Sequence, residues 1–178
     1  MSELYKGYKI AIEYDTDAEC PNDWGSYQIV PNSEDYYTAT GKLKPEYQAK
    51  IRAGKMFAVD KFEHGNVAYG LAGSFTDRWD TSRGWGWIIF EDEYVKGTTF
   101  DERKGYAEGD LETYTDWANG NVYGYIITDP YGDEPEDSAC WGFYGYDDVL
   151  AEAKRTIDHL ISTDKPAMHA VSARSLHR

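Results

Sequence analysis

The sequence has no long hydrophobic run and only two cysteines. None of its 178 residues belongs to an apolar stretch near the roughly 20 residues that cross a bilayer, and the N-terminus lacks the basic and then apolar pattern of a signal sequence. These absences predict a cytoplasmic protein without a membrane partner. Cys20 and Cys140 cannot form a zinc site alone, and a cytoplasmic chain keeps them reduced. A disulfide between them is the less favoured alternative.

The motifs of common enzyme classes are missing as well. No Gly-x-Ser-x-Gly, His-Glu-x-x-His or P-loop pattern accompanies His64, which lies in a predicted turn. A general base needs a partner and a nucleophile nearby, so a structural or solvent-exposed role for His64 is favoured over catalysis. The sequence therefore favours a protein that is not an enzyme, with no catalytic residues and no cofactor.

Positive charge is scarce, and negative charge is in excess. The chain has 18 Lys and Arg against 32 Asp and Glu, for a net charge of −14. From Gly105 to Ala153 there are twelve acidic residues and no Lys or Arg, and Glu13 to Asp23 adds five acids without a base. After Thr163 three bases face one acid, so the preceding residues carry −16. Such a field repels DNA, RNA and anionic membranes, and it attracts basic partners.

Periodicity and composition predict one α+β domain over residues 1–162. The aromatic content of 16% argues against disorder, and a chain of this length can bury a substantial core. Alternation and turn signals predict a mostly antiparallel sheet of five or six strands with two or three helices packed on it. The expected strands are 8–14, 55–62, 67–71, 85–90 (central), 122–127 and 139–144, and the expected helices are 45–53, 108–118 and 147–162, the last capped by Asp147. Residues 163–178 are expected to form a flexible basic tail.

Four carboxylates alternate just after the first predicted strand: Glu13, Asp15, Asp17 and Glu19. If the strand continues, they line one face about 6 to 7 Å apart, a spacing that allows a Ca²⁺ or Mg²⁺ site. The EF-hand pattern fails, because counting from Asp15 the sixth residue is Cys20 instead of Gly. A solvated acidic edge and a partner-facing acidic stripe are the other two interpretations, and both are favoured over a metal site.

Glycines alternate with large aromatic residues in two predicted strands, Trp85-Gly86-Trp87 and Trp141-Gly142-Phe143. Glycine in a strand often marks a close backbone approach or a partner for an aromatic ring. A packed glycine–aromatic sheet is the favoured interpretation, and a ring-binding pocket is the alternative.

Three segments resemble a family of small proteins encoded by phages, prophages and plasmids. The segment 121–129 (NVYGYIITD), the acidic loop, 138–145 (SACWGFYG) and a final helix are similar to the family's "GDVYGYVVED…SCWGFYG" ending. Residues 12–24 and 79–89 resemble its opening and its "WDSGQVGFIYV" segment, in the same order. The chain departs from the family over 30–55 and by the insertion of Ala139. The resemblance implies a mobile-element setting and carries over no activity or functional residues.

The implied mobile-element setting and the excess of negative charge together lead to a functional hypothesis. Mobile elements commonly encode acidic proteins that occupy the DNA-binding grooves of host defence nucleases, and sixteen net negative charges match the phosphates of about eight base pairs. We therefore expect an anti-restriction or anti-CRISPR inhibitor that does not bind nucleic acid itself. An interaction protein with an aromatic-rich surface and a small metal-dependent enzyme using Glu13 to Glu19 are the alternatives. The residues expected to face the basic groove of a host protein are Glu13, Asp15, Asp17, Glu19, Asp23, Glu108, Asp110, Glu112, Asp133, Glu134, Glu136 and Asp137.

Overall fold

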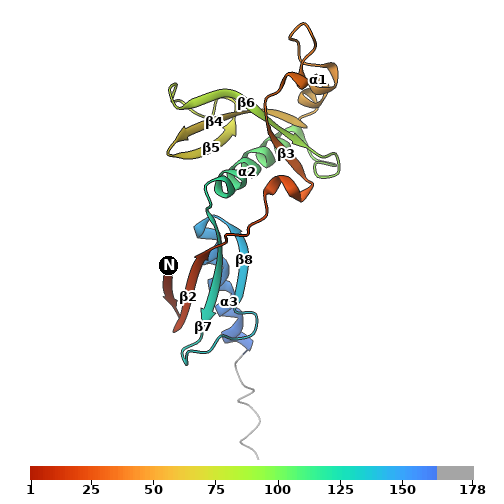
Figure 1. The fold of residues 1–178 in the computed structure, drawn as a ribbon. Helices are drawn as coiled ribbons and strands as arrows, with labels where there is room; N and C mark the ends of the chain where they lie inside the picture. Colours follow the sequence, from red (N-terminus) through yellow and green to blue (C-terminus); the bar gives the residue numbers. More distant parts are fainter. Residues whose placement is uncertain (164–178) are drawn as a thin grey trace, which may run out of the picture. The chain divides into compact units, whose positions relative to one another are not determined.

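The structure, a computed structural model, describes residues 1–163 and confirms the α+β class (Figure 1). These residues form three α-helices and eight strands, and the strands make two four-stranded antiparallel sheets. The expected single sheet of five or six strands is therefore corrected to two sheets with more strands. The chain divides into two compact units: unit 1 (residues 1–15 and 122–163) and unit 2 (residues 16–121). The single domain over 1–162 stays a prediction. Of the predicted tail, Thr163 ends a helix and 164–178 lie outside the described residues.

Unit 1 is a sheet with one helix on one of its faces (Figure 1). The strand order is β1-β2-β7-β8, and the elements are β1 (Ser2–Tyr5), β2 (Tyr8–Tyr14), β7 (Val122–Thr128), β8 (Ala139–Tyr144) and α3 (Tyr146–Thr163). The predicted alternation of β2 is confirmed from Tyr8 to Ile12, since every second residue there enters the core and meets the helical i, i+4 stripe of α3. Tyr14, expected on the same face, is 60% exposed. That core consists of Tyr8, Ile10, Ile12, Tyr123, Tyr125, Ile127, Val149, Ala153 and Ile157.

The prediction that Asp147 caps the last helix is wrong. Because α3 begins at Tyr146, Asp147 and Asp148 lie inside its first turn. Carboxylates in a first helical turn interact favourably with the free N–H groups and the helix dipole, so the two acids still stabilise this end.

Unit 2 is a second sheet, of order β3-β6-β4-β5, packed against α2. Its elements are the 3₁₀ turns η1 (Pro21–Trp24) and η2 (Glu34–Tyr36), with β3 (Tyr27–Pro31), α1 (Pro45–Arg52), β4 (Met56–His64), β5 (Asn66–Leu71), β6 (Thr81–Phe90) and α2 (Phe100–Ala118). The internal position of β6 confirms that residues 85–90 are a central strand. The core consists of Tyr27, Ile29, Val59, Ile88, Phe90, Val95, Ala107 and Leu111.

Helix α2 begins at Phe100, eight residues before the predicted start at Glu108. A capping box fixes this end: the Glu102 backbone N–H donates to Thr99 Oγ1, and the Thr99 N–H donates to Glu102 Oε2 at 2.7 Å. Gly105 lowers the helix propensity of the residues before Glu108, which explains why the early part was not predicted.

The glycines of the two glycine–aromatic strands serve different purposes. A Cβ on Gly86 would lie 2.1 Å from the Val30 carbonyl oxygen, so this glycine permits a close approach of β3 to β6. The packed-sheet interpretation holds here. Gly142 instead has φ +85° and open space around its Cβ position among the described residues. It supplies a left-handed conformation at the irregular β7–β8 pairing.

Candidate partner-binding surfaces

The alternating carboxylates after β2 do not share a strand face. β2 ends at Tyr14 and a turn follows at 16–17, so the condition for a four-acid stripe is not met. Glu13 and Asp15 belong to unit 1, whereas Asp17 and Glu19 belong to unit 2. Within residues 1–163, no group of three or more His, Cys, Asp or Glu is arranged to hold a metal ion. The metal-dependent enzyme therefore has no geometric support among these residues.

Both units are acidic by themselves. Unit 1 has twelve Asp and Glu against four Lys and Arg in its described residues, a net charge of −8. Unit 2 has nineteen against eleven, again a net −8. The negative field is thus a property of each unit and needs no particular arrangement of the two.

In unit 1 the predicted acidic residues occur at two ends of the sheet. The loop of Asp133, Glu134, Glu136 and Asp137 follows the end where Lys9 of β2 pairs with Thr128 of β7, whereas Glu13 pairs with Gly124. Four residues of strand separate these positions, on the order of 13 Å. The four loop acids are all exposed.

The acidic loop of unit 1, residues 129–137, is shaped by its first carboxylate. Asp129 accepts hydrogen bonds from the backbone N–H groups of Tyr131 and Asp133, at 2.8 and 2.9 Å. This turn displays Tyr131 with 91% of its surface exposed. The loop therefore presents one aromatic ring among several carboxylates, a combination suited to a basic partner.

Three of the four bases of unit 1 are already paired, at positions away from the acidic loop, and the fourth is Lys9 of β2. Three ion pairs, each 2.7 Å long, join Lys6 to Asp158, Lys154 to Glu3, and Arg155 to Glu152. All three lie on β1, α3 and the turn after β1. Among the described residues, none of these bases neutralises the acidic loop.

Unit 2 carries a surface with three half-exposed aromatic rings, Trp24, Tyr94 and Tyr106, which are linked through the buried ring of Tyr27 and lie beside the Asp110 carboxylate; we call it the acidic aromatic surface. Its rings form a chain, with centroid distances of 6.5 Å for Trp24–Tyr27, 6.2 Å for Tyr27–Tyr94 and 5.8 Å for Tyr94–Tyr106. Trp24, Tyr94 and Tyr106 are 42%, 38% and 40% exposed. Large, half-exposed aromatic side chains are typical interface anchors.

A partly buried carboxylate lies at the centre of this surface. The Tyr94 hydroxyl donates to both oxygens of Asp110, at 3.2 and 3.3 Å. Burial raises the pKa of Asp110 to about 6, although the hydrogen bond from Tyr94 acts in the opposite direction. Burial and the neighbouring Asp110 charge raise the pKa of Tyr94 to about 12. A cation from a partner would find here a carboxylate that no Lys or Arg of the described residues pairs with.

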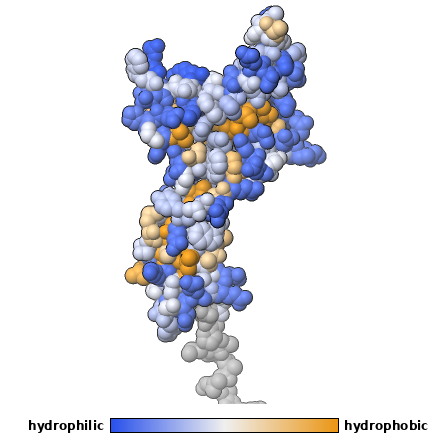
Figure 2. All heavy atoms as spheres, in the orientation of Figure 1, coloured by the Kyte–Doolittle hydropathy of each residue, from blue (hydrophilic) through white to orange (hydrophobic). Residues whose placement is uncertain are grey.

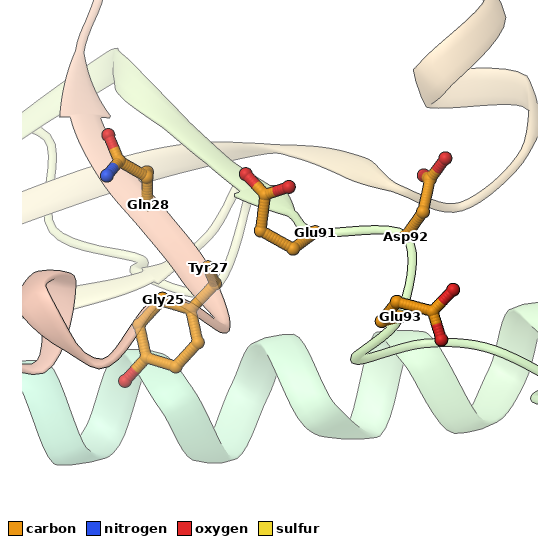
Figure 3. Close-up of a pocket in the computed structure, with 6 residues that line it drawn as sticks. All are labelled: Gly25, Tyr27, Gln28, Glu91, Asp92 and Glu93. Atoms are coloured by element: carbon orange, nitrogen blue, oxygen red, sulfur yellow. The ribbon is translucent and has the colours of Figure 1, made fainter.

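A shallow pocket of about 440 Å³ opens beside the aromatic chain (Figure 3). It is lined by Gly25, Tyr27, Gln28, Glu91, Asp92 and Glu93. Asp92 is paired with Lys55 at 2.9 Å and Glu93 with Lys96 at 3.0 Å, but no ion pair in residues 1–163 includes Glu91. The Glu91 carboxylate, which lacks an ion pair among these residues, suits the cation of a lysine or arginine side chain.

The other predicted residues of unit 2 lie along or beside α2. Glu108 and Glu112 are exposed one turn apart, and Lys104 Nζ is 3.9 Å from Glu108. Asp23 is in η1, which contacts α2, and near the other end Trp117 Nε1 donates to the Ala18 carbonyl oxygen at 3.4 Å. Unit 2 therefore brings Asp17, Glu19 and Asp23 alongside the helix that carries Glu108, Asp110 and Glu112.

Sequence reasoning missed Trp24, Tyr94, Tyr106 and the acids at 91–93. A signal was present, since three consecutive acids and then Tyr94 directly follow a central strand. His64 lies at the β4–β5 turn with its Nδ1 2.8 Å from Asp80 Oδ2, exposed as expected. Cys20 and Cys140 are not joined by a disulfide.

Comparison of the chain with known protein families, with curated proteins and with solved structures finds no match. None of the helices in residues 1–163 combines the length and the hydrophobicity that a membrane crossing requires.

Proposed function

We propose that the protein binds the basic nucleic-acid-binding groove of a host defence nuclease and inhibits it without catalysis, in the host cytoplasm. The observation that carries this proposal is the net charge of −8 on each unit. Each unit alone offers the charge of about four base pairs of DNA. The loop acids of unit 1 and Glu91 of unit 2 have no ion pair among the described residues, so they are available to a partner. The mobile-element setting comes from the resemblance of the sequence alone.

A second candidate is a partner held mainly by aromatic contacts. The half-exposed rings of Trp24, Tyr94 and Tyr106 favour it, because such anchors supply most of the binding energy in many interfaces. Salt concentration separates the two modes. Binding through charge weakens steeply as salt rises, whereas binding through aromatic burial changes little.

The test begins with a tagged pull-down from host lysate in low salt, followed by a high-salt wash and identification of the retained proteins. The purified partner is then titrated with the protein in a DNA cleavage assay at about 50 and 200 mM salt. Charge-based inhibition should weaken at least about tenfold between these conditions. Inhibition that is unchanged by salt would instead favour a partner held mainly by aromatic contacts. A partner that has no basic groove, or cleavage that is not inhibited, would contradict the nuclease proposal.

Two matched triple variants locate the contact. Glu134→Gln/Glu136→Gln/Asp137→Asn removes three charges from the acidic loop, and Glu34→Gln/Asp35→Asn/Glu46→Gln removes three exposed charges from around η2 and α1. The loop variant should lose inhibition by tenfold or more while the other keeps it. Equal losses would indicate a general charge effect without a defined interface.

A further inference from the structure

One face of the unit 1 sheet is left uncovered by α3, and each of its four strands contributes an apolar side chain there. Strand pairing places Leu4 opposite Lys9, and Ala11 opposite Ile126, on the face that points away from the core. The Trp141 ring lies on the same face, since a Cβ at Gly124 would be 2.2 Å from it. An antiparallel sheet with one solvated face normally carries polar residues there.

The apolar side chains of this bare face are accessible. Leu4 is 76% exposed and Trp141 is 46% exposed. Figure 2 shows hydrophobic side chains at the surface of this unit among hydrophilic ones. A contiguous apolar patch with a polar border is typical of an interaction site.

Two opposite charges border this patch and belong to one strand. Lys9 and Glu13 lie on the bare face of β2, two residues on either side of Ala11. Both side chains are exposed, and no ion pair among residues 1–163 includes either of them. A two-fold axis across the strands at Ala11 would place Lys9 of one copy opposite Glu13 of the other, and the reverse. The bare face is therefore complementary to itself.

We propose that the bare face of unit 1 is a self-association surface, which takes the same face of a second copy of this chain. Leu4, Ala11, Ile126 and Trp141, one from each strand, are buried between the two sheets, and two Lys9–Glu13 pairs set the orientation. Such an interface is isologous, as in most homodimers. It uses a surface separate from the acidic loop and the acidic aromatic surface, and it does not depend on the proposed inhibition.

The area of the bare face determines the affinity that we expect for the dimer. Four strands about 4.8 Å apart make a face about 19 Å wide, smaller than the roughly 800 Å² per partner of a standard interface. The like net charge of the two copies also opposes association. We therefore expect a weak dimer, with a Kd in the range of tens to hundreds of micromolar.

Sedimentation equilibrium of the full chain up to about 500 µM tests the proposal, with variants Lys9→Glu, Glu13→Lys and the double exchange. Each single reversal places like charges opposite each other and should raise the dimer Kd at least about tenfold, and the double exchange should restore it. Lys104→Glu, which changes the same charge on α2, should leave the Kd close to that of the unaltered protein.

Leu4→Asp provides a second variant, because such an exposed side chain can be replaced without loss of fold. It should abolish the dimer while circular dichroism and thermal unfolding stay unchanged. A chain that is monomeric at about 500 µM overturns the proposal. So does a dimer that is insensitive to Leu4→Asp, or one that the double exchange fails to restore.

Discussion

The hydroxyl of Tyr94 donates to both carboxylate oxygens of Asp110, at 3.2 and 3.3 Å, within the aromatic chain of unit 2. Burial nevertheless raises the pKa of this carboxyl from 3.8 to about 6. The folded protein therefore holds the Asp110 proton more tightly than the unfolded chain does. Stability falls as the pH rises from about 4 to about 6, and ionised Asp110 costs free energy above that window.

Asp110→Asn should raise the free energy of unfolding at pH 7.5 and leave it nearly unchanged at pH 4. The amide imitates the protonated acid and still accepts from Tyr94. Two pKa units correspond to about 3 kcal/mol, which partial solvent exposure reduces to about 1 kcal/mol. Urea unfolding at both pH values measures the difference. Glu112→Gln, an exposed change of equal charge on α2, is the control, and an equal response of both variants would refute the assignment to burial.

Gly86→Ala should destabilise the protein more than Gly124→Ala. At Gly86 the new methyl group would lie 2.1 Å from the backbone oxygen of Val30, which cannot move without breaking the β3–β6 pairing. At Gly124 the obstacle is the Trp141 ring, a half-exposed side chain that can rotate away. We expect the free energy of unfolding to fall by about 3 kcal/mol for Gly86→Ala and by about 1 kcal/mol for Gly124→Ala. Thermal unfolding ranks the two, and the reverse order would contradict the packing described for these strands.

Gly105→Ala and Gly109→Ala should each stabilise the protein by about 0.5 to 1 kcal/mol. Both glycines lie inside α2, and the space at their Cβ positions is open among the described residues. Gly97→Ala is the matched control, because Gly97 has similar open space but φ +77°, which disfavours a side chain. Chemical unfolding should show a gain for the helical sites and a loss at the control. A loss at all three would argue against a helix beginning at Phe100.

Asp60→Ala should lower the free energy of unfolding by about 3 kcal/mol. Only 2% of Asp60 is exposed, and its carboxylate accepts from the backbone N–H groups of Gly73 and Gly84, at 2.8 and 2.7 Å. Arg83 Nη1 is 3.4 Å away. Arg83→Ala, which leaves the two backbone bonds in place, should cost less than half as much. Urea unfolding of both variants checks the order, and equal costs would show that the ion pair dominates.

Local periodicity was sufficient to predict β2, β6 as a central strand, and the last helix. In each of these the apolar spacing and the packed core have the same period. It could not show that β2 pairs with β7, because pairing between strands so far apart leaves no local pattern. β3 was missed because its five residues lie in a polar stretch and end at a proline.

The acidic character was visible in the sequence, but its distribution in space was not. A turn at 16–17 separates the carboxylates that alternation had placed on one strand. In the sequence nothing distinguishes Asp110 from Glu108 and Glu112. In the structure Asp110 is partly buried and bonded to Tyr94, whereas the two glutamates are exposed. Burial is decided by the tertiary fold, which residue spacing alone does not report.

Unit 2 interrupts unit 1 between two neighbouring strands. The chain leaves after Asp15 and returns at Val122, where the Asp15 N–H donates to the Val122 carbonyl oxygen at 2.8 Å. Joining β2 to β7 across an unfolded segment of residues 16–121 would cost about 3 kcal/mol more in chain entropy than a short hairpin. Within unit 2, the contact of Ala18 with Trp117 already holds both ends close together.

Folding of unit 2 can therefore close the loop before the first sheet forms. We expect the inserted unit to set the order of events in refolding. Substitutions that slow the folding of unit 2 should delay β2–β7 pairing, while substitutions in α3 should leave the folding rate of unit 2 unchanged. In a chain emerging from the ribosome, β2 could pair with β1 but would lack its other neighbour, β7, until the residues up to Thr128 had been synthesised.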